Sequence, residues 1–282
     1  DVAVRYGSTA EMAAQLLEGG AGSPADVYFS QDAGALQAVE DAGLLAPLSQ
    51  TSLELVAGVY RSEAGRWVGT SGRARVITYN SDLVPVGQLP DSVMDLTDAA
   101  WKDRVAWAPT NASFQSFVTA MRLAVGDEAT EKWLTDMVAN GTRSYESNVE
   151  IREAVDAGTV KLGLSNHYYL YEKIAEVGAD AVTAANHYLA PGDAGSLVNV
   201  AGVGVLESSD KKTEAQQLVD HLLSTEGQKY FAETMFEYPL VAGIATADGL
   251  RPLDEVRGPD ISLGRLSDVE ATQQMLQRAD LI

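Results

Sequence analysis

The chemically most informative part of the sequence is an aromatic run that holds two consecutive tyrosines, Tyr168 and Tyr169. The run follows the apolar segment Val160 to Leu164, a predicted strand, and open α/β sheets place their ligands beyond the carboxyl ends of strands. A small, hard cation of high charge such as ferric iron can displace phenol protons, because binding the phenolate releases more free energy than removing a proton of pKa near 10 costs. The alternative is aromatic packing with the hydroxyls at the surface, which is the commoner role of adjacent tyrosines.

A second polar stretch, Pro109-Thr-Asn-Ala-Ser113, leads from a predicted strand into a predicted helix. Free backbone amides and hydroxyls at a helix start suit a small anion, and Ser113 is the best-placed side chain. Ser147 and Asn148 open another predicted helix in the same way, and Arg73 can offer a positive charge to the same anion. These residues also fit ordinary helix N-caps, so the pattern is compatible with either role.

Other reactive motifs are incomplete. The three histidines lack the paired helical spacing of a zinc hydrolase site. The segment 163–167 begins like a nucleophile elbow but has His167 where the closing glycine is needed, and the dinucleotide-like segment 202–207 breaks at Glu207. The chain has no cysteine, so any metal must bind through oxygen or nitrogen. We therefore expect a protein that is not an enzyme.

Length and charge narrow the class of protein further. The 282 residues are 46% hydrophobic, which is typical of a globular chain with one or two domains. The formal net charge of -20 repels nucleic acid and anionic lipid and attracts cations, although so diffuse a charge also simply keeps a protein in solution. No stretch is long and apolar enough to cross a bilayer, and the first six residues lack the pattern of a signal peptide.

Alternating strand and helix patterns must position the polar residues. We predict a strand over residues 2–6, a helix over 10–18 and a strand over 25–29, and similar units follow along the chain. This is the pattern of an α/β protein with mostly parallel sheets. Two long apolar segments, Ala74 to Tyr79 and Leu197 to Leu206, are candidates to cross between two lobes and act as a hinge, although such strands are more often core strands near a bulge.

Several short motifs occur in one order along the chain. They are Ala25-Asp-Val-Tyr-Phe29, Gly72-Arg-Ala-Arg-Val-Ile-Thr-Tyr-Asn80, Ala108-Pro-Thr-Asn-Ala-Ser113, Asn166-His-Tyr-Tyr169, Leu189-Ala-Pro-Gly192 with Gly195-Ser-Leu-Val-Asn-Val200, and Glu237-Tyr-Pro239. Each motif is weak alone. Their order and spacing together resemble the bacterial ferric-ion-binding proteins, which are periplasmic or lipid-anchored partners of iron ABC transporters.

The resemblance implies a type II periplasmic-binding-protein fold. Each lobe is expected to be a mixed, mostly parallel sheet flanked by helices, and two crossing strands join the lobes. The first lobe would comprise residues 1–77 and 204–255, and the second residues 78–203 and 256–282. The family opens with an additional strand, so we expect this first lobe to lack its initial strand. The implied protein is a periplasmic or lipid-anchored monomer that captures ferric iron in the interlobe cleft and passes it to a membrane permease.

The resemblance also implies roles for individual residues. Tyr168 and Tyr169 match the paired tyrosine ligands of the family. Gln31 stands where some members have a glutamate ligand, with Asp32 beside it, and an amide oxygen is the poorer partner for ferric iron. In some members a synergistic anion, for which we consider carbonate, phosphate or citrate, completes the metal shell. Its predicted binding residues are Asn111, Ala112, Ser113, Asn148, Asn166 and Arg73.

Two other functions stay open at this stage. The same fold could bind another small ligand, such as an organic cation, a phosphorylated metabolite or an oxyanion, with Tyr168 and Tyr169 as stacking walls. A sensor that presents its liganded form to a membrane receptor would use the same binding chemistry. An enzyme on this fold is disfavoured, because the sequence shows no acid–base pair and no activated nucleophile.

Overall fold

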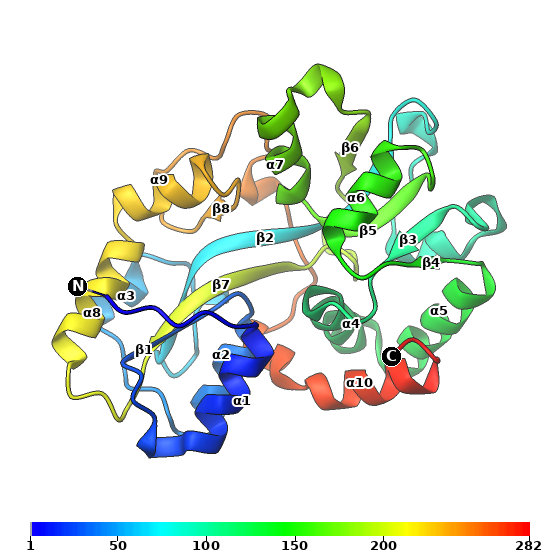
Figure 1. The fold of residues 1–282 in the computed structure, drawn as a ribbon. Coiled ribbons are helices and arrows are strands. Elements are labelled where there is room, and N and C mark those ends of the chain that lie inside the picture. The colour runs from blue at the N-terminus through cyan, green and yellow to red at the C-terminus, as the bar shows by residue number, and fades with distance from the viewer. Residues whose placement is uncertain (1) are drawn as a thin grey trace.

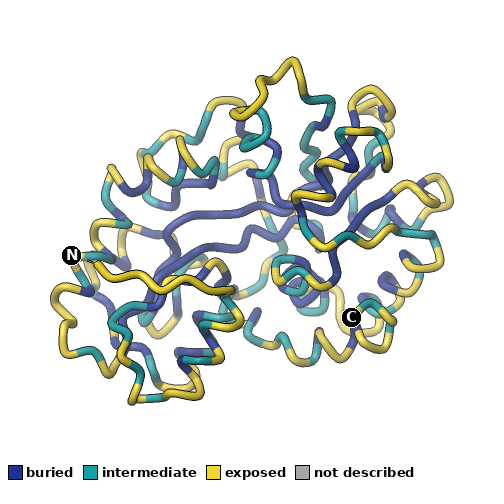
Figure 2. Tube along the Cα trace, viewed as in Figure 1, coloured by how far each residue is buried: buried dark blue, intermediate teal, exposed yellow. Residues whose placement is uncertain are grey.

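The structure is a computed structural model that describes residues 2–282. Two long strands run through the middle of the molecule (Figure 1). They are β2 (Trp67–Asn80) and β7 (Val198–Val205), and every residue of both is buried (Figure 2). The two strands pair antiparallel, from Trp67 opposite Gly204 to Ala74 opposite Val198. They are the two segments that the sequence predicts to cross between lobes, and here they form the shared centre of the fold.

The strand β2 belongs to two sheets. Up to Ala74 it pairs with β7 and β8, and from Arg75 onward it pairs with β5 and β6. The other strands are β1 (Val27–Ser30), β3 (Val105–Trp107), β4 (Arg143–Ser144), β5 (Leu162–Asn166), β6 (Ala184–His187) and β8 (Tyr238–Pro239). The change of partner after Ala74 marks the point where β2 passes from one half of the molecule to the other.

Strand directions differ from one expectation. Within residues 2–282, parallel pairing is confined to β3 with β4 and β3 with β5, and every other pairing is antiparallel. Mixed sheets are therefore confirmed, but the expected predominance of parallel pairs is wrong for the described strands. The reason is the direction of the two long strands: β2 is antiparallel to β5, β6, β7 and β8, and β7 is also antiparallel to β1, so most of the described ladders are antiparallel.

Helices cover both sheets (Figure 1). Those around the first sheet are α1 (Thr9–Gly19), α2 (Ala33–Asp41), α3 (Gln50–Glu54), α8 (Lys212–Leu222) and α9 (Thr225–Glu233). Those around the second sheet are α4 (Ala112–Val125), α5 (Asp127–Ala139), α6 (Asn148–Asp156), α7 (Tyr168–Val177) and α10 (Val269–Arg278). No helix within residues 2–282 has the length and apolar character needed to span a bilayer.

Short polar side chains set where several helices begin. Ser8, Ser147 and Ser224 each accept a hydrogen bond from the backbone N–H three residues later, at 3.2 Å in every case. Such a cap pairs one of the N–H groups that the first turn of a helix leaves unpaired. Asp32 caps α2 in the same manner by accepting from the Ala35 N–H, and Asn111 caps α4 by accepting from the Ser113 N–H two residues later.

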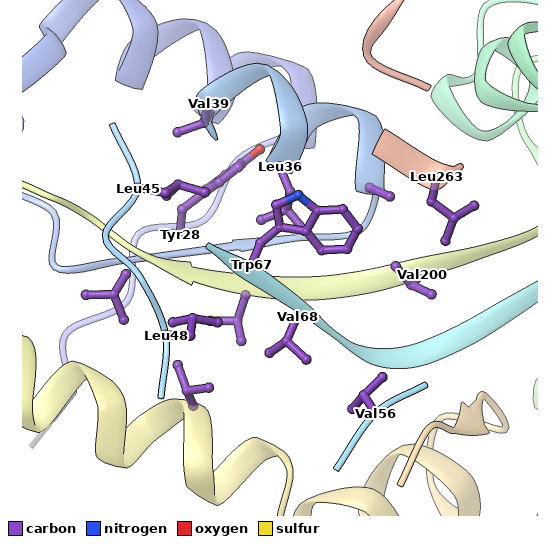
Figure 3. Close-up of a cluster of buried hydrophobic side chains, with 14 of the residues drawn as sticks. Tyr28, Leu36, Val39, Leu45, Leu48, Val56, Trp67, Val68, Val200 and Leu263 are labelled. Atoms are coloured by element: carbon purple, nitrogen blue, oxygen red, sulfur yellow. The ribbon is translucent and has the colours of Figure 1, made fainter. Parts of the chain in front are cut away.

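The molecule has two main hydrophobic cores, one on each sheet. Figure 3 shows the first, in which Trp67 of β2 packs among side chains that include Leu36 of α2. The second surrounds Trp107, whose ring meets that of Phe114 edge to face with centroids 5.6 Å apart. Separate cores are what two lobes require, because each lobe buries its own sheet face.

The carboxyl-terminal segment packs on both cores. Leu263 and Leu266 lie in the first core, whereas Met275 and Leu276 lie in the second. The contact with α2 is close, since a Cβ added to Gly34 would come within 2.5 Å of the Leu266 carbonyl oxygen. The predicted division places all of residues 256–282 in the second lobe, whereas this segment connects the two halves in addition to β2 and β7.

The amino-terminal segment departs from its sequence pattern. Val2, Val4 and Tyr6 alternate with polar or small residues as in a strand, but they are 66%, 60% and 88% exposed and have no described ladder partner. The predicted strand over residues 2–6 is therefore wrong in this structure, because a strand needs a neighbour to pair its backbone groups. The helix predicted after it is confirmed as α1.

His167 ties the second sheet to the crossing strand. It directly follows β5, its ring is 0% exposed, and its Nδ1 accepts a hydrogen bond from the Ala74 N–H at 3.1 Å. Its Nε2 lies 2.9 Å from the Phe236 carbonyl oxygen, to which only a protonated Nε2 can donate. The neutral ring satisfies both contacts, and burial lowers the pKa of His167 to about 4. The junction of the two halves therefore depends on an uncharged imidazole.

Acidification is expected to weaken the fold through His167. Below pH 6.5 the unfolded chain binds a proton at this histidine, whereas the folded chain resists it down to pH about 4, so stability falls as the pH falls through that window. Between pH 7 and pH 5 the loss is about 2 kcal/mol. Denaturant unfolding at both pH values should show a smaller difference for His167→Gln than for the parent. An equal difference in both proteins would contradict this role.

Candidate functional site

The tyrosine pair begins α7, immediately after β5 and His167. The two rings lie close together, with centroids 4.3 Å apart and planes tilted by 33°. Tyr168 is 8% exposed and Tyr169 is half-buried, yet neither belongs to a hydrophobic core of the described residues. The pair thus stands at the carboxyl end of a strand and beside the point where β2 changes partner, as the sequence predicts for a binding site.

A buried charge pair lies beside Tyr168. Burial raises the pKa of the Tyr168 phenol above its ordinary value of 10, and the guanidinium of Arg73 opposes that rise. Arg73 is itself buried, with its Nε 4.0 Å from Oε1 of Glu237, whose Oε2 accepts a hydrogen bond from Ser71. Glu237 therefore holds the charge of Arg73 in place, and Arg73 favours the phenolate form of Tyr168.

Four of the predicted anion-binding residues meet in one polar cluster. Ser113 Oγ donates to Asn111 Oδ1 at 2.7 Å, and Asn148 Nδ2 donates to Ser113 Oγ at 3.1 Å. These side chains come from the first turns of α4 and α6, and Asn166 joins them from the end of β5. Ala112 is the first residue of α4. Three distant stretches of sequence thus converge, as the resemblance implies.

The cluster also contains Arg75, which the sequence analysis did not single out. Arg75 Nη1 donates to Asn166 Oδ1 at 3.2 Å and to Ser113 Oγ at 3.3 Å. Arg73, the predicted partner of this cluster, lies instead with Glu237 and Tyr168. The signal for Arg75 was present, because residues two apart on a strand share one face of the sheet.

Asp32 and Gln31 have different environments. Asp32 is buried, and its Oδ1 accepts a hydrogen bond from the Ala35 N–H at 3.1 Å as the cap of α2. Its Oδ2 accepts hydrogen bonds from Asn199 Nδ2 at 2.6 Å and from Ser116 Oγ at 2.5 Å. Ser116 belongs to α4, so Asp32 links the two halves and would have to give up these bonds to bind a metal. Gln31, in contrast, is exposed.

The protein groups alone make an incomplete metal site. Among residues 2–282 there is no group of three or more His, Cys, Asp or Glu side chains that could hold a metal ion. Two phenolates would fill only part of the shell of a hard cation and leave positions for an external ligand. The polar cluster lies beside the tyrosines through Arg75, whose guanidinium interacts electrostatically with both Tyr169 and Tyr168. A metal here would therefore be bound together with an anion or another oxygen donor.

Known proteins resemble the chain along almost its whole length. It is 34% identical over 277 residues to the Fe(3+)-binding periplasmic protein of Serratia marcescens, covering 98% of this chain and 82% of that protein. Iron-bound HitA from Pseudomonas aeruginosa matches with a TM-score of 0.92 and 35% identity, covering 99% of this chain and 90% of that one. The Trichodesmium protein IdiA (FutA), in complex with iron and citrate ligands, matches with a TM-score of 0.87 and 29% identity, covering 98% and 90%.

The fold expected from the sequence, that of the two-lobed periplasmic binding proteins, is confirmed by these structures. A family model described as bacterial extracellular solute-binding protein matches residues 22–255. Proteins of this kind are a non-enzymatic class that works with ABC transporter permeases. The chain therefore belongs to the bacterial extracellular solute-binding protein family.

Proposed function

We propose that this protein captures ferric iron between its two lobes and delivers it to the permease of an ABC transporter. The observation that carries the proposal is the pair Tyr168 and Tyr169, which follows β5 and lies outside the hydrophobic cores. Their ring centroids are 4.3 Å apart. Phenolate oxygens are hard, charged ligands that suit Fe3+ better than the softer divalent ions. The names of the Serratia relative and of iron-bound HitA support the same cargo.

The proposed ligand set starts from the two phenolates. Arg73 favours ionised Tyr168, which reduces the free energy needed to remove its proton when iron binds. Of the two residues predicted in the first lobe, Gln31 is the better candidate to approach the metal when the lobes close. Asp32 is the weaker candidate, because both of its carboxylate oxygens already accept hydrogen bonds within the protein.

We further propose that a synergistic anion, such as carbonate, phosphate or citrate, completes the iron shell. Its site is the polar cluster at the starts of α4 and α6, where Asn148 of α6 donates a hydrogen bond to Ser113 of α4. The proposed contacts are Asn111, Ala112, Ser113, Asn148 and Asn166. Arg73 remains a candidate for the site through its position beside Tyr168. The iron and citrate ligands of the Trichodesmium protein support an anion of this kind.

The proposed setting is the periplasm, as the name of the Serratia relative indicates for that protein. A soluble or lipid-anchored monomer with no enzymatic activity fits capture and delivery. In the proposed closure the two lobes are the halves on either side of Ala74, and residues 256–282 pack on both of them. The alternative cargo on the same fold is another small ligand, such as an organic cation, a phosphorylated metabolite or an oxyanion, stacked against the tyrosines.

The first prediction about iron binding concerns the two tyrosines. Tyr168→Phe and Tyr169→Phe keep the ring but remove the oxygen. Loss of a group that only supports a metal ligand weakens metal binding by about tenfold to a hundredfold. Loss of a ligand oxygen should therefore weaken ferric iron binding by about a hundredfold or more. Each should also weaken the visible charge-transfer absorption of phenolate-bound iron. Competition with EDTA, followed by absorbance, measures both effects.

Tyr171→Phe is the matched control for this test. Tyr171 lies on the same helix, but its hydroxyl donates to the Gly249 carbonyl oxygen at 2.8 Å. It should bind iron like the parent protein. If Tyr168→Phe and Tyr169→Phe also bind iron like the parent, the ligand assignment is wrong. A parent protein that stays colourless with ferric iron, and binds a phosphorylated metabolite or an organic cation instead, would support the alternative cargo.

The second prediction concerns closure of the lobes. A ligand shifts an open–closed equilibrium only if it binds the two states differently, so iron must contact both lobes in the closed state. Small-angle scattering should show a smaller radius of gyration at iron saturation than without iron. Ser116→Ala removes the hydrogen bond from α4 to Asp32, so its iron-free form should be more open than the iron-free parent. An unchanged radius of the parent at saturation would show that the hinge is not used.

A further inference from the structure

We infer that Arg152 of α6 is a positioning residue for the tyrosine pair, because it holds the backbone of Tyr169 and so fixes both candidate metal ligands relative to the polar cluster. Its Nη1 donates to the Tyr169 carbonyl oxygen at 2.9 Å. The inference rests on the proposed iron site and adds to it a residue that acts through the tyrosines. The sequence analysis did not single out this arginine.

The start of α7 has little support of its own. Several other helices begin with a side chain that pairs a free backbone N–H, whereas His167, at the N-cap position of α7, makes no such bond with any described residue. The His167 ring contacts the Ala74 N–H and the Phe236 carbonyl oxygen instead. The first turn of a helix has free N–H groups and frays readily, so the tyrosines at this turn need a contact from elsewhere in the fold.

Arg152 supplies that contact from the neighbouring helix α6. A carbonyl oxygen has two lone pairs, so the Tyr169 oxygen can accept the Arg152 N–H as well as a bond within its own helix. Arg152 is 7% exposed, and a hydrogen bond from a charged donor in so dry a position is stronger than one between neutral groups. Asn186 holds the residue before the pair, since its Nδ2 donates to the His167 carbonyl oxygen at 2.7 Å. Two side chains from outside α7 thus fix the backbone that carries the tyrosines.

The Arg152 side chain is itself held in place by charge. Its Nη2 donates to Oε1 of Glu153 at 2.5 Å, and the same oxygen lies 3.4 Å from Nζ of Lys173 on α7. Burial raises the pKa of Glu172, also on α7, and the nearby Arg152 guanidinium opposes that rise. Buried charge is stable only when it is compensated, so these carboxylates keep the guanidinium beside α7. One ionic cluster therefore joins α6 to the turn of α7 that follows the tyrosines.

The position of Arg152 on α6 links the tyrosines to the polar cluster. Asn148 precedes Arg152 by four residues, so the two side chains share one face of the helix, and both are buried. Asn148 donates to Ser113 in the cluster at 3.1 Å, whereas Arg152 donates to Tyr169. A single helix therefore sets the distance between the phenols and the groups proposed to bind the anion. Iron that contacts both needs this distance to be accurate, because binding groups must be held within about 0.5 Å of their productive positions.

The test measures ferric iron affinity and charge-transfer absorption in variants of Arg152. In competition with EDTA, Arg152→Gln should weaken iron binding by about tenfold to a hundredfold, the range for losing a group that orients a metal ligand. It should also change the wavelength or the intensity of the absorption, because this signal depends on how the phenolates meet the iron. Arg152→Lys keeps the charge but not the two-sided guanidinium, so it should show a smaller change in both measurements.

Arg122→Gln is the matched control for this test. Arg122 lies in the last turn of α4, its side chain is 8% exposed like that of Arg152, and its Nε lies 2.9 Å from Oδ1 of Asp127. Both Gln variants should unfold at a lower temperature than the parent, because each loses a buried ion pair. Only Arg152→Gln should lose iron affinity and change the absorption, whereas Arg122→Gln should match the parent in both.

Two results would overturn the inference while the proposed function stands. One is parent-like affinity and absorption in Arg152→Gln, and the other is an equal loss of affinity in Arg152→Gln and Arg122→Gln, which would trace the loss to general destabilisation. If Arg152→Gln does not fold, Arg152→Lys carries the test, and parent-like values in this variant would overturn the inference. A parent protein that binds no ferric iron would defeat the proposed function itself, and the inference with it.

Discussion

The structure depends on one strand that serves two sheets. β2 pairs with β7 up to Ala74 and with β5 from Arg75, so the backbone at this point belongs to both halves of the molecule. His167 adds a side-chain contact at the same place by accepting the Ala74 N–H. Because the residue after His167 is Tyr168, the contact that joins the halves also fixes where the tyrosine pair begins. A rotation of one half against the other that bends β2 where it changes partner would therefore occur next to the candidate metal ligands.

The same strand carries two buried arginines beside the site. Arg73 and Arg75 share one face of β2, one on each side of the change of partner, yet their surroundings differ. Arg73 lies beside Glu237, which reaches it from the segment that leads into β8. Arg75 instead donates hydrogen bonds to Ser113 and Asn166, and its guanidinium carbon lies 5.2 Å from the centroid of the Phe117 ring. A buried guanidinium without a carboxylate is costly for the empty protein and favourable once an anion arrives.

Local patterns in the sequence predicted the parts of the site that are local in the chain. Tyr168 and Tyr169 are adjacent, and the cap of α4 is a few residues long. Both motifs can therefore be recognised without knowledge of the tertiary structure, because they need only a strand followed by a helix. The partners of Asp32 could not be predicted, because Ser116 and Asn199 lie 84 and 167 residues away. The contacts of Arg75 with Ser113 and Asn166 were equally hidden, since they depend on how β2, β5 and the start of α4 meet. The prediction of a strand over residues 2–6 was wrong because it rested on a local pattern alone. Alternation of side chains is compatible with a strand, but a strand also needs a neighbouring strand to pair with, and the pattern carries no information about that neighbour.

An anion in the iron shell would also explain how tight capture is compatible with release. Two ligands that share a site are coupled reciprocally, so whatever the anion adds to the affinity for iron, iron adds to the affinity for the anion. A shell made only of protein carboxylates and phenolates can be weakened only by opening the lobes. A shell that includes an exchangeable anion can be weakened in two ways, by opening the lobes or by loss of the anion. Both oxygens of the Asp32 carboxylate accept hydrogen bonds that link α2 with α4 and β7, so Asp32 would have to break these bonds before it could add a negative charge to the proposed shell.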